Sequence, residues 1–251
     1  MAMTSTGAGE RAARIVVGAE SKAHGSSLNT EPVIQLSGAS AAFDGRVVLS
    51  DINVSIHRGE RVAVMGRSGA GKSTLLQLLY AQRPADIALI PQAAALVKTL
   101  SVFHNVFMGR LDRHSTTYNL RTLAWPTRPE LEAVGAVLAD VGLLEKLRAK
   151  AGALSGGQQQ RVSVARALYN GRPILLGDEP VSALDRVQGS QILTLLRQRH
   201  ETLVLVMHDI PLALEHSDRI VVLDGGRKII DAPSADLTPR DLLGRFEGGG
   251  S

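Results

Sequence analysis

The chain has 251 residues, no cysteine and a formal net charge of +4. Its length accommodates one compound α/β domain with a sizeable core, and the absence of cysteine excludes disulfides and thiolate metal sites. Lysine and arginine are spread along the chain without interleaved aromatic residues, so a solvated surface explains the charge better than a nucleic-acid site does. The apolar runs reach only about five residues, whereas a helix that crosses a bilayer needs roughly 20. Any role in a membrane process therefore requires a separate membrane protein.

The N-terminal part of the chain divides into an irregular extension and a pair of strands. Residues 1–31 are dominated by Ser, Thr, Gly and Ala around one apolar cluster at residues 15–17, and this composition predicts a disordered extension. Residues 33–56 alternate apolar and polar side chains in short pieces, with breaks at Asp44-Gly45 and at Ser50-Asp51. That alternation predicts antiparallel strands that pack beside the next segment.

A glycine-rich loop lies between a short apolar run at residues 62–65 and a helical run from residue 74. It fits the pattern G-x-x-x-x-G-K-[ST], in which backbone N–H groups cradle phosphate at a helix N-terminus. Lys72 would reach the β- and γ-phosphates, and the Ser73 hydroxyl would ligate Mg²⁺. A chance Gly/Ser turn is the competing interpretation, and the order of strand, loop and helix argues against it. The predicted nucleotide-binding residues of this loop are Gly66, Arg67, Ser68, Gly69, Ala70, Gly71, Lys72, Ser73 and Thr74.

The segments after this loop alternate between short strands and helices. Residues 81–86 connect the first helix directly to a short apolar run that ends at Gln92. Residues 101–147 have helical spacing, and they predict a helical subdomain over about residues 97–170.

A buried strand at residues 174–177 ends in two acids. Asp178 lies where a carboxylate would hold Mg²⁺ opposite Ser73, and Glu179 points elsewhere, where it could polarise an attacking water as general base. Two adjacent acids can also simply end a strand in solvent, and the phosphate loop upstream favours the catalytic interpretation. A later apolar strand ends in His208, which is either a surface histidine or part of the same site.

Two further motifs complete the set. Leu154-Ser155-Gly156-Gly157-Gln158 precedes a strongly helical run, and residues 182–185 follow the two acids. In this order the motifs resemble the nucleotide-binding domain of ATP-binding cassette (ABC) transporters over about residues 33–231. The resemblance implies an α/β fold: a P-loop NTPase core with a parallel sheet, an antiparallel β subdomain and a helical subdomain. The family usually inserts a longer segment before Gln92, so the β subdomain should be trimmed here.

The resemblance also implies the roles of the site residues in an Mg-dependent ATPase that binds ATP and Mg²⁺. Glu179 would be the general base, His208 a switch that contacts the γ-phosphate, and Gln92 a sensor of Mg²⁺ and the attacking water. The implied metal ligands are Ser73, Gln92 and Asp178. Phe43 sits where the family keeps an aromatic that stacks on adenine, although a lone phenylalanine is more often part of a core.

The glycine pair Gly156-Gly157 is expected to cap a helix that begins near Gln158, so that bare N–H groups face outward. By resemblance, this end closes over the γ-phosphate bound to a second copy of the chain. The implied signature residues are Leu154, Ser155, Gly156, Gly157 and Gln158. The implied dimer seam is Ser182, Ala183, Leu184 and Asp185.

Residues 100–111, together with residues 158–161, look most like the ATPase subunits of phosphonate-type importers. This implies a homodimer on the cytoplasmic face of the bacterial inner membrane that works with an integral membrane permease and a solute-binding protein. An ATPase of an exporter or lipoprotein-release system and a soluble ABC protein outside transport remain alternatives. The ATPase domain is expected over residues 32–246, and residues 247–251 resemble a flexible linker remnant.

Overall fold

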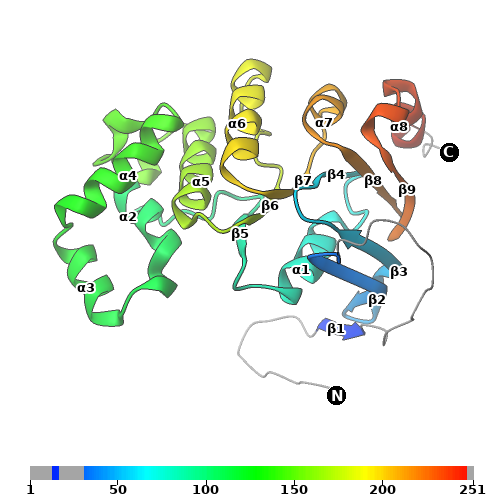
Figure 1. Ribbon diagram of the computed structural model, residues 1–251, viewed down its shortest axis with the longest axis horizontal. Coiled ribbons are helices and arrows are strands. Elements are labelled where there is room, and N and C mark those ends of the chain that lie inside the picture. The colour runs from blue at the N-terminus through cyan, green and yellow to red at the C-terminus, as the bar shows by residue number, and fades with distance from the viewer. Residues whose placement is uncertain (1–12, 17–30, 248–251) are drawn as a thin grey trace.

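The computed structural model describes residues 13–16 and 31–247. Its centre is a six-stranded sheet of order β5-β6-β7-β4-β8-β9, in which β9 alone is antiparallel to its neighbour (Figure 1). Helices cover both faces of this sheet, so its central strands are continuous apolar runs, and every residue of β6 and β7 is buried. The strands are β4 (Arg61–Gly66), β5 (Ile87–Ile90), β6 (Ile174–Asp178), β7 (Thr202–Val206), β8 (Arg219–Asp224) and β9 (Arg227–Pro233).

The two faces of the sheet have separate hydrophobic cores. Successive residues of a strand point to opposite faces, and β4 shows this directly. Val62 and Val64 pack with helix α1 (Lys72–Gln82) and a second sheet, whereas Ala63 and Met65 pack in the core of the other face. Three helices cover that other face (Figure 1): α6 (Arg186–Arg199), α7 (Ile210–His216) and α8 (Pro239–Glu247).

The second sheet is antiparallel and has the order β1-β2-β3, with β2 at Ile34–Phe43 and β3 at Arg46–Ile56. The predicted break at Asp44-Gly45 is confirmed as the hairpin turn, and both residues have positive φ, 50° and 77°, as a tight Asp-Gly turn requires. The predicted break at Ser50-Asp51 is wrong. Strand β3 continues through it, with Asp51 at φ 52° where the register against β2 shifts, so this polar pair bends the strand and does not end it.

Strand β1 (Ala13–Val16) pairs antiparallel with β2, from Ala13 opposite Phe43 to Val16 opposite Ser40. The prediction of a disordered extension over residues 1–31 is therefore wrong for this short stretch, where a run of high β-propensity meets the open edge of β2. Residues 1–12 and 17–30 of that prediction lie outside the described residues, and so do residues 248–251 of the predicted linker at residues 247–251. The linker prediction is wrong for Glu247, which is the last residue of α8.

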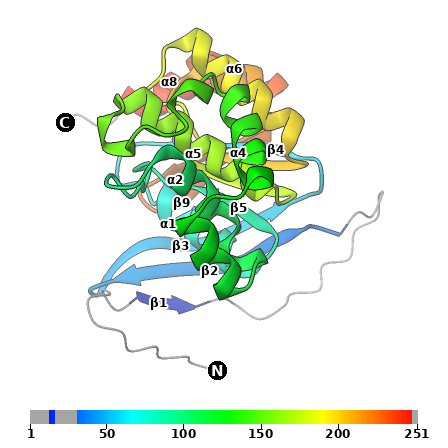
Figure 2. The ribbon, with the colours of Figure 1, turned by 90° about the vertical axis from the view of Figure 1, so that its left-hand side faces the viewer.

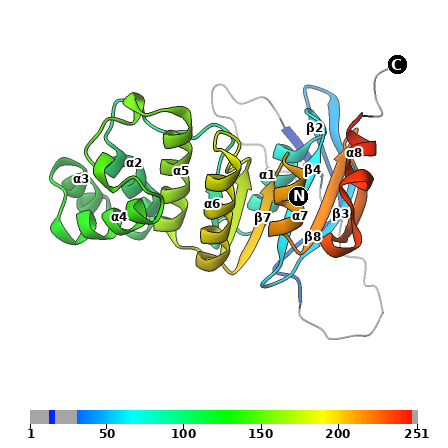
Figure 3. The same cartoon turned by 90° about the horizontal axis from the view of Figure 1, so that it is seen from above.

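The predicted helical subdomain is present as a group of helices at one end of the structure (Figure 3), in front of the sheets in Figure 2, and it shares a hydrophobic core with one face of the central sheet. Helices α2 and α4 pack on α5, whose chain then returns to the central sheet as β6. The predicted direct connection between the first helix and the next strand is also present, since a turn at residues 83–86 joins α1 to β5. The helical segments are α2 (Val102–Phe107), η1 (Met108–Arg113), α3 (Thr116–Ala124), α4 (Arg128–Asp140), η2 (Leu144–Lys146), η3 (Ala151–Ala153) and α5 (Gly156–Asn170), with η4 at Ser234–Asp236. Among the described residues, no helix combines the length and the apolar character needed to cross a membrane.

Candidate functional site

The glycine-rich loop joins the carboxyl end of β4 to the first residue of α1. Gly66 has a φ of 147°, and a Cβ there would lie 2.3 Å from the Leu223 carbonyl oxygen on the neighbouring strand. Gly71 has a φ of 97°, and its Cβ would lie 2.5 Å from the Leu49 side chain on β3. Only glycine fits at these two positions, so neighbouring strands of both sheets hold the loop in its curled conformation.

Lys72 begins α1 and is buried, with its ammonium turned back onto the loop. Nζ donates to the carbonyl oxygens of Gly66 at 2.8 Å and Arg67 at 2.9 Å. Burial lowers the pKa of Lys72, and the nearby negative charges of Glu179 and Asp178 oppose that shift. The carboxylates of Asp178 and Glu179, at the end of β6, are therefore close enough to the glycine-rich loop to act on the Lys72 ammonium.

Ser73, Gln92 and Asp178 line one cavity of about 320 Å³ between α1 and β5. The cavity wall is otherwise made by α1 and the strand before Gln92, including Leu76, Tyr80, Leu89 and Pro91. A hydroxyl, an amide oxygen and a carboxylate are the hard oxygen donors that Mg²⁺ prefers. The donor set of this cavity therefore fits the metal that the sequence implied.

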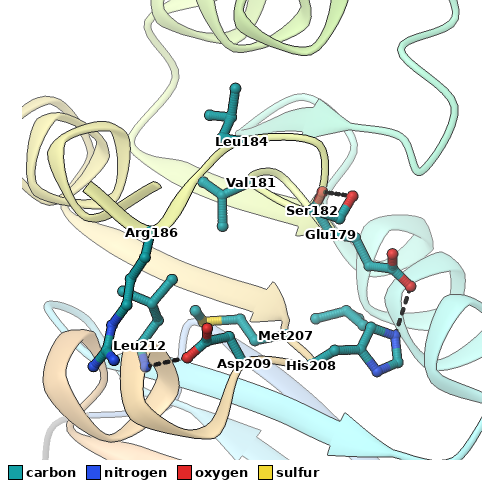
Figure 4. Close-up of a pocket in the computed structure, with 10 residues that line it drawn as sticks. Glu179, Val181, Ser182, Leu184, Arg186, Met207, His208, Asp209 and Leu212 are labelled. Atoms are coloured by element: carbon teal, nitrogen blue, oxygen red, sulfur yellow. Dashed lines mark hydrogen bonds and ion pairs between the residues drawn. The ribbon is translucent and has the colours of Figure 1, made fainter. Parts of the chain in front are cut away.

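Glu179 has a φ of +55°, a conformation that costs a non-glycine residue about 1–3 kcal/mol, and it precedes Pro180, which narrows its backbone freedom further. The carboxylate meets the two other predicted catalytic residues, since Oε1 lies 2.7 Å from His208 Nε2 and accepts from Gln92 Nε2 at 3.4 Å. Figure 4 shows the carboxylate and the imidazole turned toward one another beside a cavity of about 210 Å³. Residues from the ends of β5, β6 and β7 thus converge at one edge of the sheet.

The signature residues form the start of α5. The expected cap differs in detail, because the helix begins at Gly156 and Ser155 caps it, accepting from Gln158 N–H at 3.3 Å while Gln158 Oε1 accepts from Ser155 N–H at 3.0 Å. The N–H groups of Gly156 and Gly157 have no intrahelical acceptor in this first turn. Among the described residues, the hydrogen bonds of residues 154–158 are local and do not reach the glycine-rich loop.

The predicted seam residues 182–185 follow Glu179 and contact α5 of the same chain. A Cβ at Gly157 would lie 2.9 Å from the Ala183 carbonyl oxygen and 3.2 Å from Leu184. Asp185 has a structural task here, since its carboxylate caps α6 by accepting from Gln188 N–H at 2.9 Å. The signature and seam residues are therefore adjacent within one chain.

Phe43 ends β2 at the hairpin and is half-buried against the core that contains α1. Its stacking on adenine stays a prediction. Sequence reasoning missed Gln160 as a site residue, although its side chain hydrogen-bonds the Glu179 carbonyl at 2.6 Å. The run of three glutamines at residues 158–160 was visible in the sequence, but it was used only for the resemblance to importer ATPases and not to assign a role to Gln160.

A parallel sheet with a glycine-rich loop at a helix N-terminus and two acids on the adjacent strand end defines a P-loop NTPase. The chain belongs to the ABC transporter family, whose model matches residues 49–182. It is an ATP-hydrolysing ABC transport ATPase with the α/β fold that the sequence predicted. Phe43 and His208 lie outside the matched span.

Comparison with individual proteins agrees with this family. The chain is 33% identical over 249 residues to the phosphonates import ATP-binding protein PhnC of Caulobacter vibrioides, covering 86% of this chain and 94% of that protein. It is 36% identical to the macrolide export ATP-binding/permease protein MacB of Bordetella avium, covering 87% of this chain and 37% of that protein. The dimeric post-hydrolysis structure of the ATP-binding cassette MJ0796 bound to ADP and Pi is 26% identical, with a TM-score of 0.66, covering 80% of this chain and 99% of that one.

Proposed function

We propose that the chain is the ATPase subunit of an importer, which drives uptake of a phosphonate or related oxyanion through a separate permease by ATP-dependent dimerisation. The observation that carries the ATPase mechanism is the convergence of Glu179, His208 and Gln92 at the edge of the sheet beside the phosphate loop. Packing of the core does not explain why these three polar side chains meet, because Gln92 and His208 are exposed and Glu179 is only half-buried.

In the proposed reaction, the loop N–H groups and Lys72 hold the β- and γ-phosphates. Ser73, Gln92 and Asp178 would hold Mg²⁺, which supplies positive charge to the phosphate oxygens when bound. Glu179 accepts the proton of the attacking water, and His208, hydrogen-bonded to that carboxylate, contacts the γ-phosphate. Glu179 and Asp178 line two different cavities, so the two neighbouring carboxylates would serve two different tasks.

We infer that a second copy of the chain completes the site. The first-turn N–H groups of Gly156 and Gly157 form a helix N-terminus that suits an anion, and the hydrogen bonds of these signature residues do not link them to their own phosphate loop. The family neighbour with ADP and Pi is dimeric. ATP bound between two copies would join them, and hydrolysis would release them, as in a ligand-driven two-state switch.

The docking surface for the permease is proposed around the segment from Gln92 to Phe103. A groove of about 600 Å³ lies between β5, this segment and the helical subdomain, and it shares Tyr80, Leu89 and Pro91 with the cavity of the metal ligands. Two apolar side chains of this region, Leu89 and Val97, are about 40% exposed. Arg166 on α5 donates to the carbonyl oxygens of Ala94 and Ala95 at 3.1 and 2.9 Å, so movement of the segment and of α5 would be coupled.

Import of an oxyanion, a periplasmic or extracellular binding protein and a peripheral position on the cytoplasmic face of the cell membrane are proposed from the relatives. The phosphonate import protein of Caulobacter is matched over nearly its whole length. The export protein MacB is matched at comparable identity, although over only 37% of its length, so export is the alternative function. No nucleic-acid partner is proposed.

Reconstitution of the chain with its native permease and binding protein would test this proposal. We expect ATP hydrolysis in proteoliposomes to rise when binding protein loaded with a phosphonate is added, and we expect no rise with the Glu179→Gln variant. Stimulation by an amino acid or a sugar but by no phosphonate would refute the solute. Transport from the ATP side outward would refute import and favour the export alternative.

A further inference from the structure

The side chain of Gln160 joins helix α5 to the loop that begins with Glu179. Gln160 is 8% exposed, and a buried carboxamide needs partners for both its carbonyl and its amino group. Nε2 donates to the Glu179 carbonyl at 2.6 Å and to Ser182 Oγ at 3.2 Å. Oε1 accepts from Ala183 N–H at 2.8 Å. All the polar atoms of this side chain are therefore engaged with one loop.

The chemistry of these partners fixes the orientation of the carboxamide. The Ala183 N–H can only donate, and the Glu179 carbonyl can only accept. A flipped amide would place carbonyl against carbonyl and N–H against N–H, so the orientation follows from the partners themselves.

Gln160 bonds to the residue whose backbone conformation is the least favourable in the site. Glu179 has a φ of +55°, and such a conformation persists only where the surroundings over-determine it. Its N–H donates to the Val206 carbonyl at 3.1 Å, and its carbonyl accepts from Gln160, from Ser182 N–H at 3.3 Å and from Ser182 Oγ at 3.2 Å. The bond from Gln160 is the shortest of these and the one that comes from another subdomain.

The N-terminal turn of α5 contacts the same loop. A Cβ at Gly157 would lie 2.9 Å from the Ala183 carbonyl oxygen, so the helix backbone and the loop backbone are in direct contact. Gln160 lies one turn further along that helix and holds the loop by hydrogen bonds. A displacement of α5 would therefore move the backbone of Glu179 as well.

We propose that Gln160 is a positioning residue that makes the aim of the Glu179 carboxylate depend on the position of the signature helix. When α5 is seated, Gln160 holds Glu179 in its left-handed conformation, and its carboxylate faces His208 and Gln92. When α5 moves away, the clamp on Glu179 loosens and the base loses its alignment. This inference rests on the proposed role of Glu179 as general base.

Two near-isosteric substitutions test the proposal. Gln160→Glu keeps the acceptor for Ala183 N–H and removes the donor to the Glu179 carbonyl, and Gln160→Met removes both. We expect kcat for ATP to fall on the order of 10²-fold in both, the usual cost of misaligning a catalytic group, with KM and Kd for Mg-ATP within about twofold of wild type. Gln191→Met, on an exposed position of α6, is the control and should leave kcat unchanged.

A double-mutant cycle distinguishes positioning of Glu179 from general damage. In the Glu179→Gln background, long single-turnover incubations should show no further loss on adding Gln160→Glu, because the residue that it positions is already disabled. The same fold-loss in both backgrounds would overturn the proposal, and so would a kcat within about threefold of wild type in Gln160→Glu. Retained turnover in Glu179→Gln alone would instead refute the base assignment, which separates the two failures.

A surface variant keeps the test decisive if the Gln160 variants do not fold. Ser182→Ala removes a hydroxyl that donates to the same carbonyl, and because Ser182 is exposed, the truncation leaves no buried cavity. We expect a smaller fall in kcat, about three- to tenfold, again with unchanged KM. A rise in KM without a fall in kcat would overturn the proposal.

Discussion

Replacing Lys72 with methionine tests the phosphate loop by removing a charge and little else. Methionine keeps most of the apolar stem in its buried position, so packing around α1 changes little. The lost group is an ammonium that two carbonyl oxygens, of Gly66 and Arg67, hold at the loop at 2.8 and 2.9 Å. With Mg-ATP bound, this ammonium would instead hydrogen-bond the phosphates. A hydrogen bond of a charged group is worth about 1.5–3 kcal/mol, so its loss should weaken the Kd for Mg-ATP roughly 10- to 150-fold.

The free energy of unfolding should fall as well, because the free chain loses the hydrogen bonds from Nζ to the Gly66 and Arg67 carbonyls. Burial lowers the pKa of Lys72, so removing the ammonium also removes a desolvation cost that offsets part of this loss. Isothermal titration with Mg-ATP and a urea denaturation curve measure the two quantities, with Lys146→Met as control for loss of a lysine elsewhere. A Kd within about threefold of wild type, with the fold intact, would refute the assignment of Lys72 to the phosphates.

Three further outcomes are expected. Glu179→Gln should lower ATP turnover by at least about 10²-fold while ATP binding persists. In gel filtration this variant should elute as a dimer with ATP and as a monomer without ATP. Turnover at the wild-type rate, or a monomer whether or not ATP is present, would contradict the mechanism. Gly157→Ala should lower the free energy of unfolding, measured in urea, by about 1–3 kcal/mol, because its methyl group would lie 2.9 Å from the Ala183 carbonyl oxygen. Gly156→Ala, which places its methyl group in open space, should not lower it. An equal loss of stability in the two variants would refute the contact. Burial would raise the pKa of Asp231, but hydrogen bonds from Arg219 and Lys228 hold it below its usual value. The stability from this lowered pKa is present above about pH 4 and lost as pH falls through the folded-state pKa. Asp231→Asn should therefore have a free energy of unfolding about 1–3 kcal/mol below that of wild type at pH 7, and urea titrations in acid should show this difference closing. A difference that grows in acid would refute the lowered pKa.

The features that could be predicted from the sequence are those that depend on residues next to one another in the chain. The glycine-rich loop and the Asp44-Gly45 turn each require special backbone conformations that only certain residues allow, so short patterns are enough to recognise them. The strand ends that carry Asp178 and His208 were visible as apolar runs that stop at a polar residue.

Other features depend on contacts between residues far apart in the chain. The left-handed backbone of Glu179 is held by β7 and by α5, and nothing in the local sequence demands it. Gln160 looks like any helical glutamine until the fold brings it against the loop after β6. The strand at residues 13–16 forms only because it pairs with the open edge of β2. Ser155 was not predicted as the helix cap, because the cap was assigned to the two glycines that follow it.

The short turn at residues 83–86 also offers a means to separate ATP hydrolysis from its control by the proposed permease. Because the turn is on the surface between α1 and β5, doubling its length should cost only about 0.6 kcal/mol of chain entropy. A few inserted polar residues would nevertheless overhang the groove lined by Tyr80, Pro84 and Leu89. If the permease docks in this groove as proposed, such a variant should hydrolyse ATP alone at its normal rate but no longer respond to the permease. It would then show how much of the ATP hydrolysis in the assembled transporter the partner controls.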